Sequence, residues 1–117
     1  MPSEKPIQRL NDILDNIGWV IEYTRGKRYD DFAQDRLTRD AVERCLLRIS
    51  EAARKLEGIV DQVAADQPWS DIRSLGNVIR HEYDVIDAGV IWKIVEDDLL
   101  PLRDAVQSAI AKLKPPE

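Results

Sequence analysis

The sequence predicts an all-α protein, a bundle of four or five helices, on three observations. Apolar residues recur at three- and four-residue steps through most of the 117 residues. No stretch of convincing length alternates apolar and polar residues, as a half-buried strand would. Hydrophobic residues make up 44% and charged residues 33%, which is typical of a folded globular protein. We expect a single domain over residues 1–117, with a frayed tail from about residue 114.

The first helix is predicted by an apolar stripe near the start of the chain, formed by Ile7, Leu10, Leu14, Ile17 and Ile21. The segment TRGKRYDDFAQD then interrupts the pattern with a glycine and a polar run, so a loop or a short turn is expected there. Asp35 and Thr38 are both candidate caps for the helix that follows.

The second helix has the clearest pattern, because one apolar face continues for about six turns from Val42 to Val63. Arginine, lysine and glutamate cover much of its remaining surface. Gly58 is expected to end or bend this helix. Cys45 lies on the apolar face and is interpreted as a small core residue, not a reactive thiol.

The third helix is predicted to be shorter and to end near Tyr83. A linker, AADQP, precedes it, and Ser70 or Asp71 is the expected cap. Trp69, at the start of this segment, is interpreted as a packing anchor in the core.

A last helix is predicted from Val90 to Leu113, with Trp92 as a second core anchor. Pro101 lies inside this pattern. Because proline lacks an N–H donor and crowds the preceding turn, it should kink or divide the helix near residues 97–100.

The overall charge limits the possible functions. A net charge of −5 argues against broad attraction to polyanions, so any nucleic-acid chemistry has to use a local basic cluster. No apolar run approaches the roughly 18 residues of a membrane span, and no secretory signal is recognised at the start. We therefore expect a cytoplasmic location and no membrane partner.

The only histidine, His81, lies in the stretch GNVIRHEYD. On a helix that turns by about 100° per residue, Arg73, Asn77 and His81 follow one ridge, and Arg80 nearly eclipses Arg73. This places two guanidinium groups, an amide and an imidazole near one surface. Imidazole can exchange a proton near neutral pH, and guanidinium can hold a phosphate. A metal-free ribonuclease fits this set, although a packed or interface histidine and a metal ligand stay open.

Several stretches, in order and spacing, resemble the HepT-like HEPN ribonuclease toxins: YDDFAQD, RDAVERCLLRISEAARKL, PWSDIRSLGNVIRHEYDVID and IWKIVEDDLLPLRDAV. The resemblance runs from about Ile7 to about Ile110. It implies a HEPN-type bundle with antiparallel up-down packing, which dimerises and cuts RNA without metal or cofactor. It also implies a partner, a minimal nucleotidyltransferase antitoxin of the MntA type.

The family motif reads arginine, four residues, histidine, one residue, tyrosine. His81 and Tyr83 match it, and the resemblance implies that the first is catalytic and the second accepts AMP from the antitoxin. Gly76 occupies the arginine position, and Asn77, which often follows that arginine, is present. Arg73 and Arg80 are therefore proposed as substitutes on helical geometry.

Two functions follow from this pattern. The first is a metal-independent endoribonuclease toxin that uses His81. The second is a HEPN-fold binding module that partners a nucleotidyltransferase and has weakened or lost cleavage through the glycine at position 76. Under the second, Gly76→Arg is expected to restore activity. Trp19 and Tyr23 of the first helix are candidates for a dimer face.

Overall fold

The computed structural model describes residues 5–81 and 87–114, and the regular structure in these two ranges is entirely helical. Four helices are substantial: α1 (Pro6–Thr24), α3 (Arg36–Lys55), α5 (Trp69–His81) and α7 (Leu99–Leu113). Shorter segments join them: α2 (Tyr29–Gln34), α4 (Val60–Val63), α6 (Ala88–Lys93) and the π-helical turn η1 (Ile94–Asp98). The all-α prediction is confirmed. Within the described ranges, no helix has both the length and the apolar character to cross a bilayer.

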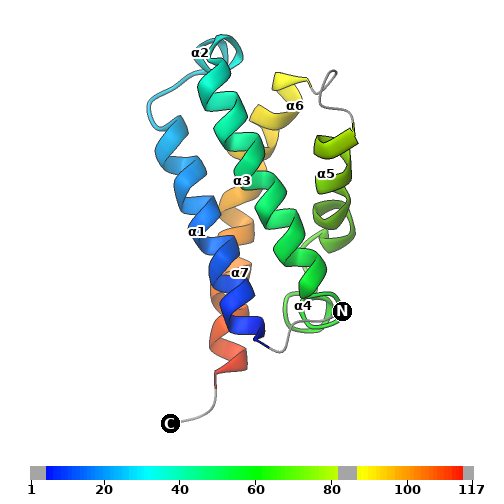
Figure 1. The fold of residues 1–117 in the computed structure, drawn as a ribbon. Coiled ribbons are helices and arrows are strands. Elements are labelled where there is room, and N and C mark those ends of the chain that lie inside the picture. The colour runs from blue at the N-terminus through cyan, green and yellow to red at the C-terminus, as the bar shows by residue number, and fades with distance from the viewer. Residues whose placement is uncertain (1–4, 82–86, 115–117) are drawn as a thin grey trace.

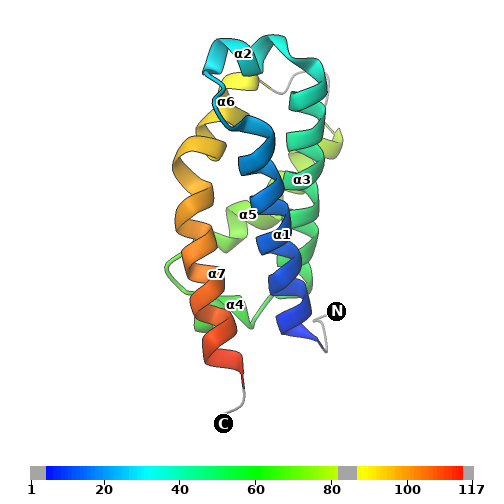
Figure 2. The same cartoon turned by 90° about the vertical axis from the view of Figure 1, so that its left-hand side faces the viewer.

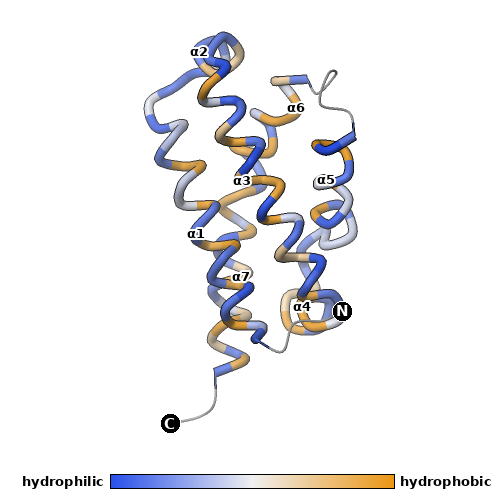
Figure 3. Tube along the Cα trace, viewed as in Figure 1, coloured by the Kyte–Doolittle hydropathy of each residue, from blue (hydrophilic) through white to orange (hydrophobic). Residues whose placement is uncertain are grey.

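The long helices pack in alternating directions, and α3 lies between α1 and α5 (Figure 1). Figure 2 shows α7 running beside α1. The core between these helices is largely aliphatic, and its most deeply buried residues include Ile17, Val20, Leu46 and Val106. Apolar and polar residues alternate along each helix in Figure 3, as expected for helices that bury one face and expose the other. The periodic stripes read from the sequence thus form the observed core.

The segment between α1 and α3 is more ordered than the sequence predicted, because it contains the short helix α2. The carboxylate of Asp31 accepts a hydrogen bond from the backbone N–H of Arg28 (2.9 Å), which closes the first turn. Phe32 is fully buried and its ring lies 5.1 Å from that of Trp92, centroid to centroid. One aromatic side chain thus anchors a polar sequence to α6, a contact that local polarity does not reveal.

Asp35 and Thr38 were the two predicted candidate caps for α3, and the structure shows that Asp35 is the N-cap. Its Oδ1 accepts from the backbone N–H of Thr38 (3.1 Å) and its Oδ2 from the Thr38 hydroxyl (2.6 Å). These hydrogen bonds from Thr38 lower the pKa of the Asp35 carboxyl below its ordinary value. The cap satisfies a donor that the first helical turn leaves open.

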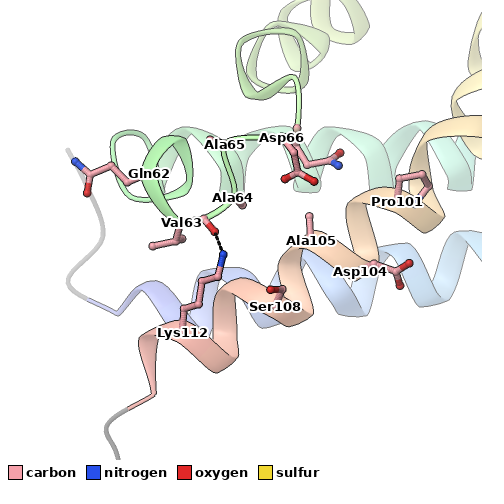
Figure 4. A pocket seen from close by; sticks show the side chains of 11 residues that line it. Gln62, Val63, Ala64, Ala65, Asp66, Pro101, Asp104, Ala105, Ser108 and Lys112 are labelled. Carbon is pink, nitrogen blue, oxygen red and sulfur yellow. Dashed lines mark hydrogen bonds between the residues drawn. The ribbon is translucent and has the colours of Figure 1, made fainter.

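The predicted long second helix is divided at Gly58, as the sequence indicated. The α3 helix ends at Lys55, Gly58 has a φ of 89°, and the chain restarts as α4. A left-handed φ is readily accessible to glycine and costly for other residues. The short α4 helix is tied to α7 by Lys112, whose Nζ donates to the carbonyl oxygen of Val63 (2.9 Å, Figure 4).

The start of α5 differs from the prediction. The helix begins at Trp69, so the predicted caps Ser70 and Asp71 lie within its first turn. Trp69 is 2% exposed, and its indole Nε1 donates to the carbonyl oxygen of Ala64 (2.7 Å). This buried anchor, confirmed as a core residue, fixes where the helix starts. The predicted end near Tyr83 lies outside the described residues.

The last predicted helix is interrupted before Pro101, as expected. The interruption is the π-helical turn η1, Ile94–Asp98, between α6 and α7, slightly earlier than the predicted 97–100. Proline has no N–H to donate to the carbonyl four residues back, so one hydrogen bond of a regular α-helix is missing here. The wider π-helical turn accommodates this break in the hydrogen-bond pattern. Trp92, just before the interruption, is 9% exposed and confirms its predicted place in the core.

Cys45 is buried and makes no disulfide, in agreement with its interpretation as a core residue. Burial raises the pKa of its thiol, with a smaller opposing effect of Arg48. A protonated, buried thiol is a poor nucleophile, so Cys45 contributes packing and no chemistry.

Candidate functional site

The helix that carries His81 is held against α3 by a close contact between Gly76 and Ser50. The Ser50 hydroxyl donates to the carbonyl oxygen of Arg73 (2.8 Å) and accepts from the N–H of Gly76 (3.0 Å). A β-carbon on Gly76 would lie 2.5 Å from the Ser50 Oγ and 3.0 Å from its Cβ. The position where the resemblance leads one to expect an arginine is therefore a buried helix–helix contact.

The next turn of α5 brings Arg80 and Asn77 together, as the sequence predicted. One Nη of Arg80 forms a hydrogen-bonded ion pair with the carboxylate of Glu51 on α3. The other Nη donates to the Oδ1 of Asn77 (3.2 Å). Planar guanidinium held at two nitrogens has a fixed direction, and it keeps further N–H donors for a ligand.

Arg73 is directed elsewhere. Its two Nη atoms donate to the two carboxylate oxygens of Asp61, each at 3.2 Å, and its side chain is only 16% exposed. Asp61 also accepts from the N–H of Gly58 (2.9 Å). The ridge geometry placed Arg73 beside Asn77 and His81, but in the structure its guanidinium joins α5 to Asp61 in the first turn of α4.

The Arg73–Asp61 pair gives a testable pH dependence. Hydrogen bonds from Arg73 lower the pKa of Asp61 below its unfolded value, which is about 3.9. The pair therefore contributes stability above that value, and the contribution is lost as pH falls through the lower folded pKa. We expect Asp61→Asn to melt at a lower temperature than the wild type at pH 7.

The difference in melting temperature should shrink at pH 3, because the wild-type carboxylate is then becoming protonated. Thermal denaturation followed by circular dichroism at both pH values measures it. Glu96→Gln, an exposed carboxylate on η1, is the matched control. A difference that is equal at pH 3 and pH 7 contradicts the assignment of the pair.

His81 is the last residue of α5 and is exposed to solvent. Within residues 5–81 and 87–114 its imidazole has no hydrogen-bond or ion-pair partner. It follows Arg80 in the chain, so the imidazole and the oriented guanidinium leave the same helix end. Tyr83, the other motif residue, lies outside the described residues.

A groove of about 670 Å³ runs between α1 and α3 and reaches Arg80. Its lining is basic, with five cationic side chains and two carboxylates: Arg9, Arg44, Arg48, Lys55 and Arg80, against Asp12 and Glu51. The chain has a net charge of −5, so nucleic-acid chemistry would need a local basic cluster. The walls of this groove form such a cluster. From the sequence pattern, the arginines of α3 were expected only to cover the solvent-exposed side of the helix.

Two other hollows in the described part of the chain are less suited to phosphate. The one between α4 and α7, about 630 Å³ (Figure 4), contains Asp66 and Asp104, and its Lys112 is bonded to a backbone carbonyl. The other, about 400 Å³, lies between α5 and η1, is largely apolar and has Asp71, Asp97 and Asp98 at its rim. No group of three or more histidine, cysteine, aspartate or glutamate residues in the described ranges is placed to hold a metal.

Comparison with known proteins gives consistent matches. Residues 13–109 match the family described as "Ribonuclease HepT-like". The chain is 34% identical to "Putative RNase MJ1380" of Methanocaldococcus jannaschii, over 84% of this chain and 90% of the relative. It is 31% identical to "Probable ribonuclease HepT" of Thermococcus cleftensis, over 80% of this chain and 86% of the relative. No solved structure gave a significant match.

Proposed function

Since the chain belongs to the HepT-like ribonuclease family, we propose that it is a metal-independent RNA endonuclease in which His81 transfers the proton and Arg80 binds the scissile phosphate. The observation that carries the proposal is the position of Arg80. Glu51 and Asn77 orient its guanidinium at the edge of the basic groove, next in sequence to an exposed imidazole. Cleavage of a defined RNA by the purified protein in EDTA tests it.

The proposed reaction uses the nucleophile that RNA itself carries. The imidazole of His81 takes the proton of a ribose 2′-hydroxyl, and the 2′-oxygen forms a bond to the adjacent phosphorus. The bond from phosphorus to the 5′-oxygen breaks, and that oxygen takes a proton from a general acid. Arg80 stabilises the charge that develops on the phosphate oxygens. The products have a 2′,3′-cyclic phosphate and a 5′-hydroxyl.

We favour Arg80 over Arg73 as the phosphate ligand. Both nitrogens at the tip of Arg73 are engaged by Asp61, and its side chain is largely buried. The Arg80 side chain is 40% exposed. Asn77 acts as a positioning residue that holds the Arg80 fork. Arg73→Ala should lower stability and leave the cleavage rate per folded molecule within about tenfold of the wild type. Arg80→Ala should lower the cleavage rate by more than about tenfold.

A homodimer is part of the proposal, because one imidazole cannot easily act as both base and acid in one step. A second copy would supply the acid from its own His81. We expect light scattering after size exclusion to give twice the monomer mass of 13.4 kDa. A monomer that cleaves RNA at full rate would exclude the two-histidine arrangement.

The protein is further proposed to be a toxin of a bacterial type VII toxin–antitoxin system, held silent by an MntA-like nucleotidyltransferase that attaches AMP to Tyr83. Tyr83 lies two residues beyond His81, so the added phosphate would bring bulk and negative charge next to the proposed RNA phosphate site.

Incubation with an MntA-like nucleotidyltransferase and ATP should add the mass of AMP to the protein, as intact mass spectrometry would show, and should abolish cleavage. Tyr83→Phe should stay unmodified and active. Modification of Tyr83→Phe to the same extent would place AMP on another residue.

The alternative is a HEPN-fold binding module with weak or no cleavage. It is supported by Gly76, which fills the motif arginine position with a buried contact and leaves no cation there. Tight binding of a nucleotidyltransferase, together with no RNA cleavage by unmodified protein at any concentration, would favour this alternative.

A further inference from the structure

The basic groove between α1 and α3 extends beyond the residues used in the proposed cleavage step. We propose that it binds single-stranded RNA, with Trp19 stacking on a base and Arg44 and Arg48 holding the phosphate backbone. This inference rests on the proposed ribonuclease function and deepens it, because it names the form of RNA and the residues that hold it away from the scissile bond.

The cations of α3 carry the first step. Arg44, Arg48 and Lys55 line the groove and are exposed, and none forms an ion pair with a carboxylate in the described ranges. Along a helix that rises about 1.5 Å per residue, positions 44 to 55 span roughly 16 Å. Cations without carboxylate partners, spread along one wall, suit a polyanionic chain better than a single small anion.

The aromatic wall comes from α1. Trp19 lines the groove and is 42% exposed, whereas Trp69 and Trp92 are buried in the core. An exposed indole beside a cationic track is the combination by which proteins hold unpaired bases, because every base has a face that can stack. Bases of a duplex are stacked on each other, so this arrangement favours single strands.

The floor of the groove offers a further polar group. Asn16 is 4% exposed, and its Nδ2 donates to the carbonyl oxygen of Asp12 (2.8 Å). Its Oδ1 has no partner among the residues that the structure describes. An unpartnered buried acceptor at this place is a group that a ribose hydroxyl or a base amino group of bound RNA would satisfy.

The binding test uses a fluorescein-labelled single-stranded RNA of about 12 nucleotides, in EDTA, with every variant made in His81→Ala protein so that cleavage during the measurement is strongly reduced. We expect Arg44→Ala/Arg48→Ala to weaken binding at least tenfold. The slope of log affinity against log salt should fall by about 1.4, or 0.7 for each lost phosphate contact.

The matched control is Arg36→Ala/Arg103→Ala, which removes the same charge outside the groove. Equal losses of affinity in the two double variants would overturn the groove assignment. The duplex form of the same RNA is the second probe, and equal affinity for duplex and single strand would overturn the single-strand preference.

Tryptophan fluorescence tests the stacking directly. RNA should quench the emission of the exposed Trp19, and Trp19→Ala should lose most of the quench and bind roughly tenfold more weakly. Quenching that persists in Trp19→Ala would contradict stacking. Conversion of a dimer into a monomer by this substitution would assign Trp19 to the dimer face instead and overturn the inference.

Failure of the groove and failure of the nuclease are distinguishable. If wild-type protein cleaves RNA while the groove variants bind it normally, the groove assignment is wrong and the nuclease stands. If RNA binds through the groove and wild-type protein with unmodified Tyr83 does not cleave, the nuclease is wrong and the groove stands.

Discussion

His81→Ala is expected to reduce RNA cleavage by about 10²- to 10⁴-fold, the usual contribution of a general acid or base. Its melting temperature should match that of the wild type, because His81 is exposed at the end of α5 and has no partner in the described residues. The measurement is cleavage of a defined RNA in EDTA, beside circular dichroism of the same preparations. A fully active variant would remove His81 from the mechanism.

The ends of the products make this experiment more specific. A 2′,3′-cyclic phosphate on the product supports attack by the ribose 2′-hydroxyl. A 3′-hydroxyl would instead indicate that water attacks the phosphorus and that the bond from phosphorus to the 3′-oxygen breaks. Gln8→Ala, an exposed polar change on α1 outside the groove, is the control for handling and folding. Intact mass must show Tyr83 without AMP, because a modified sample would be inert for another reason.

Gly76→Arg is expected to destabilise the fold more than either Asp61→Asn or Arg73→Ala. A β-carbon at this position already meets the Ser50 Oγ at 2.5 Å, and the Ser50 hydroxyl is fixed by two hydrogen bonds. Overpacking of this kind costs about 1–3 kcal/mol. Gly76→Ala should therefore lower the free energy of unfolding despite its better helix propensity, and arginine should lower it further. Urea denaturation measures both.

Ser50→Gly is the compensating change, because it removes the Ser50 Oγ and Cβ, the two atoms nearest to the new β-carbon, and leaves only Leu47 Cδ1 at an ordinary contact distance of 3.4 Å. The double variant Ser50→Gly/Gly76→Arg should be more stable than Gly76→Arg, a coupling that a double-mutant cycle isolates. Gly76→Ala with wild-type stability would show that α5 shifts away from α3 at little cost, which contradicts a tight contact.

This contact changes the expected use of Gly76→Arg as a test of activity. The family motif predicts that the substitution restores a lost phosphate ligand, but α5 cannot accept it without moving relative to α3. The double variant is the cleaner test. Increased cleavage by the double variant would show that the missing arginine limits the enzyme, and unchanged cleavage would support Arg80 as a sufficient substitute.

The sequence predicted the elements that depend on neighbouring residues. Apolar spacing located α1, α3 and α7, because a helix repeats every 3.6 residues whatever it packs against, and the linker before Trp69 located α5. Asp35 caps α3, Gly58 follows the end of α3, and Pro101 follows the interruption at η1, as predicted. Each of these residues acts through its own backbone or side chain on groups within about one helical turn. The predicted loop missed α2 because Phe32 is anchored by Trp92, far along the chain.

The partners of the arginines were decided only by the tertiary structure. Arg73 and Arg80 are seven residues apart on one helix and have the same ridge geometry in sequence, yet one pairs with Asp61 and the other with Glu51. The open groove beside Arg44 and Arg48 likewise depends on where α1 crosses α3. A long, charged side chain can reach several partners, so its position on its own helix does not select one. The packing of the neighbouring helices makes that selection.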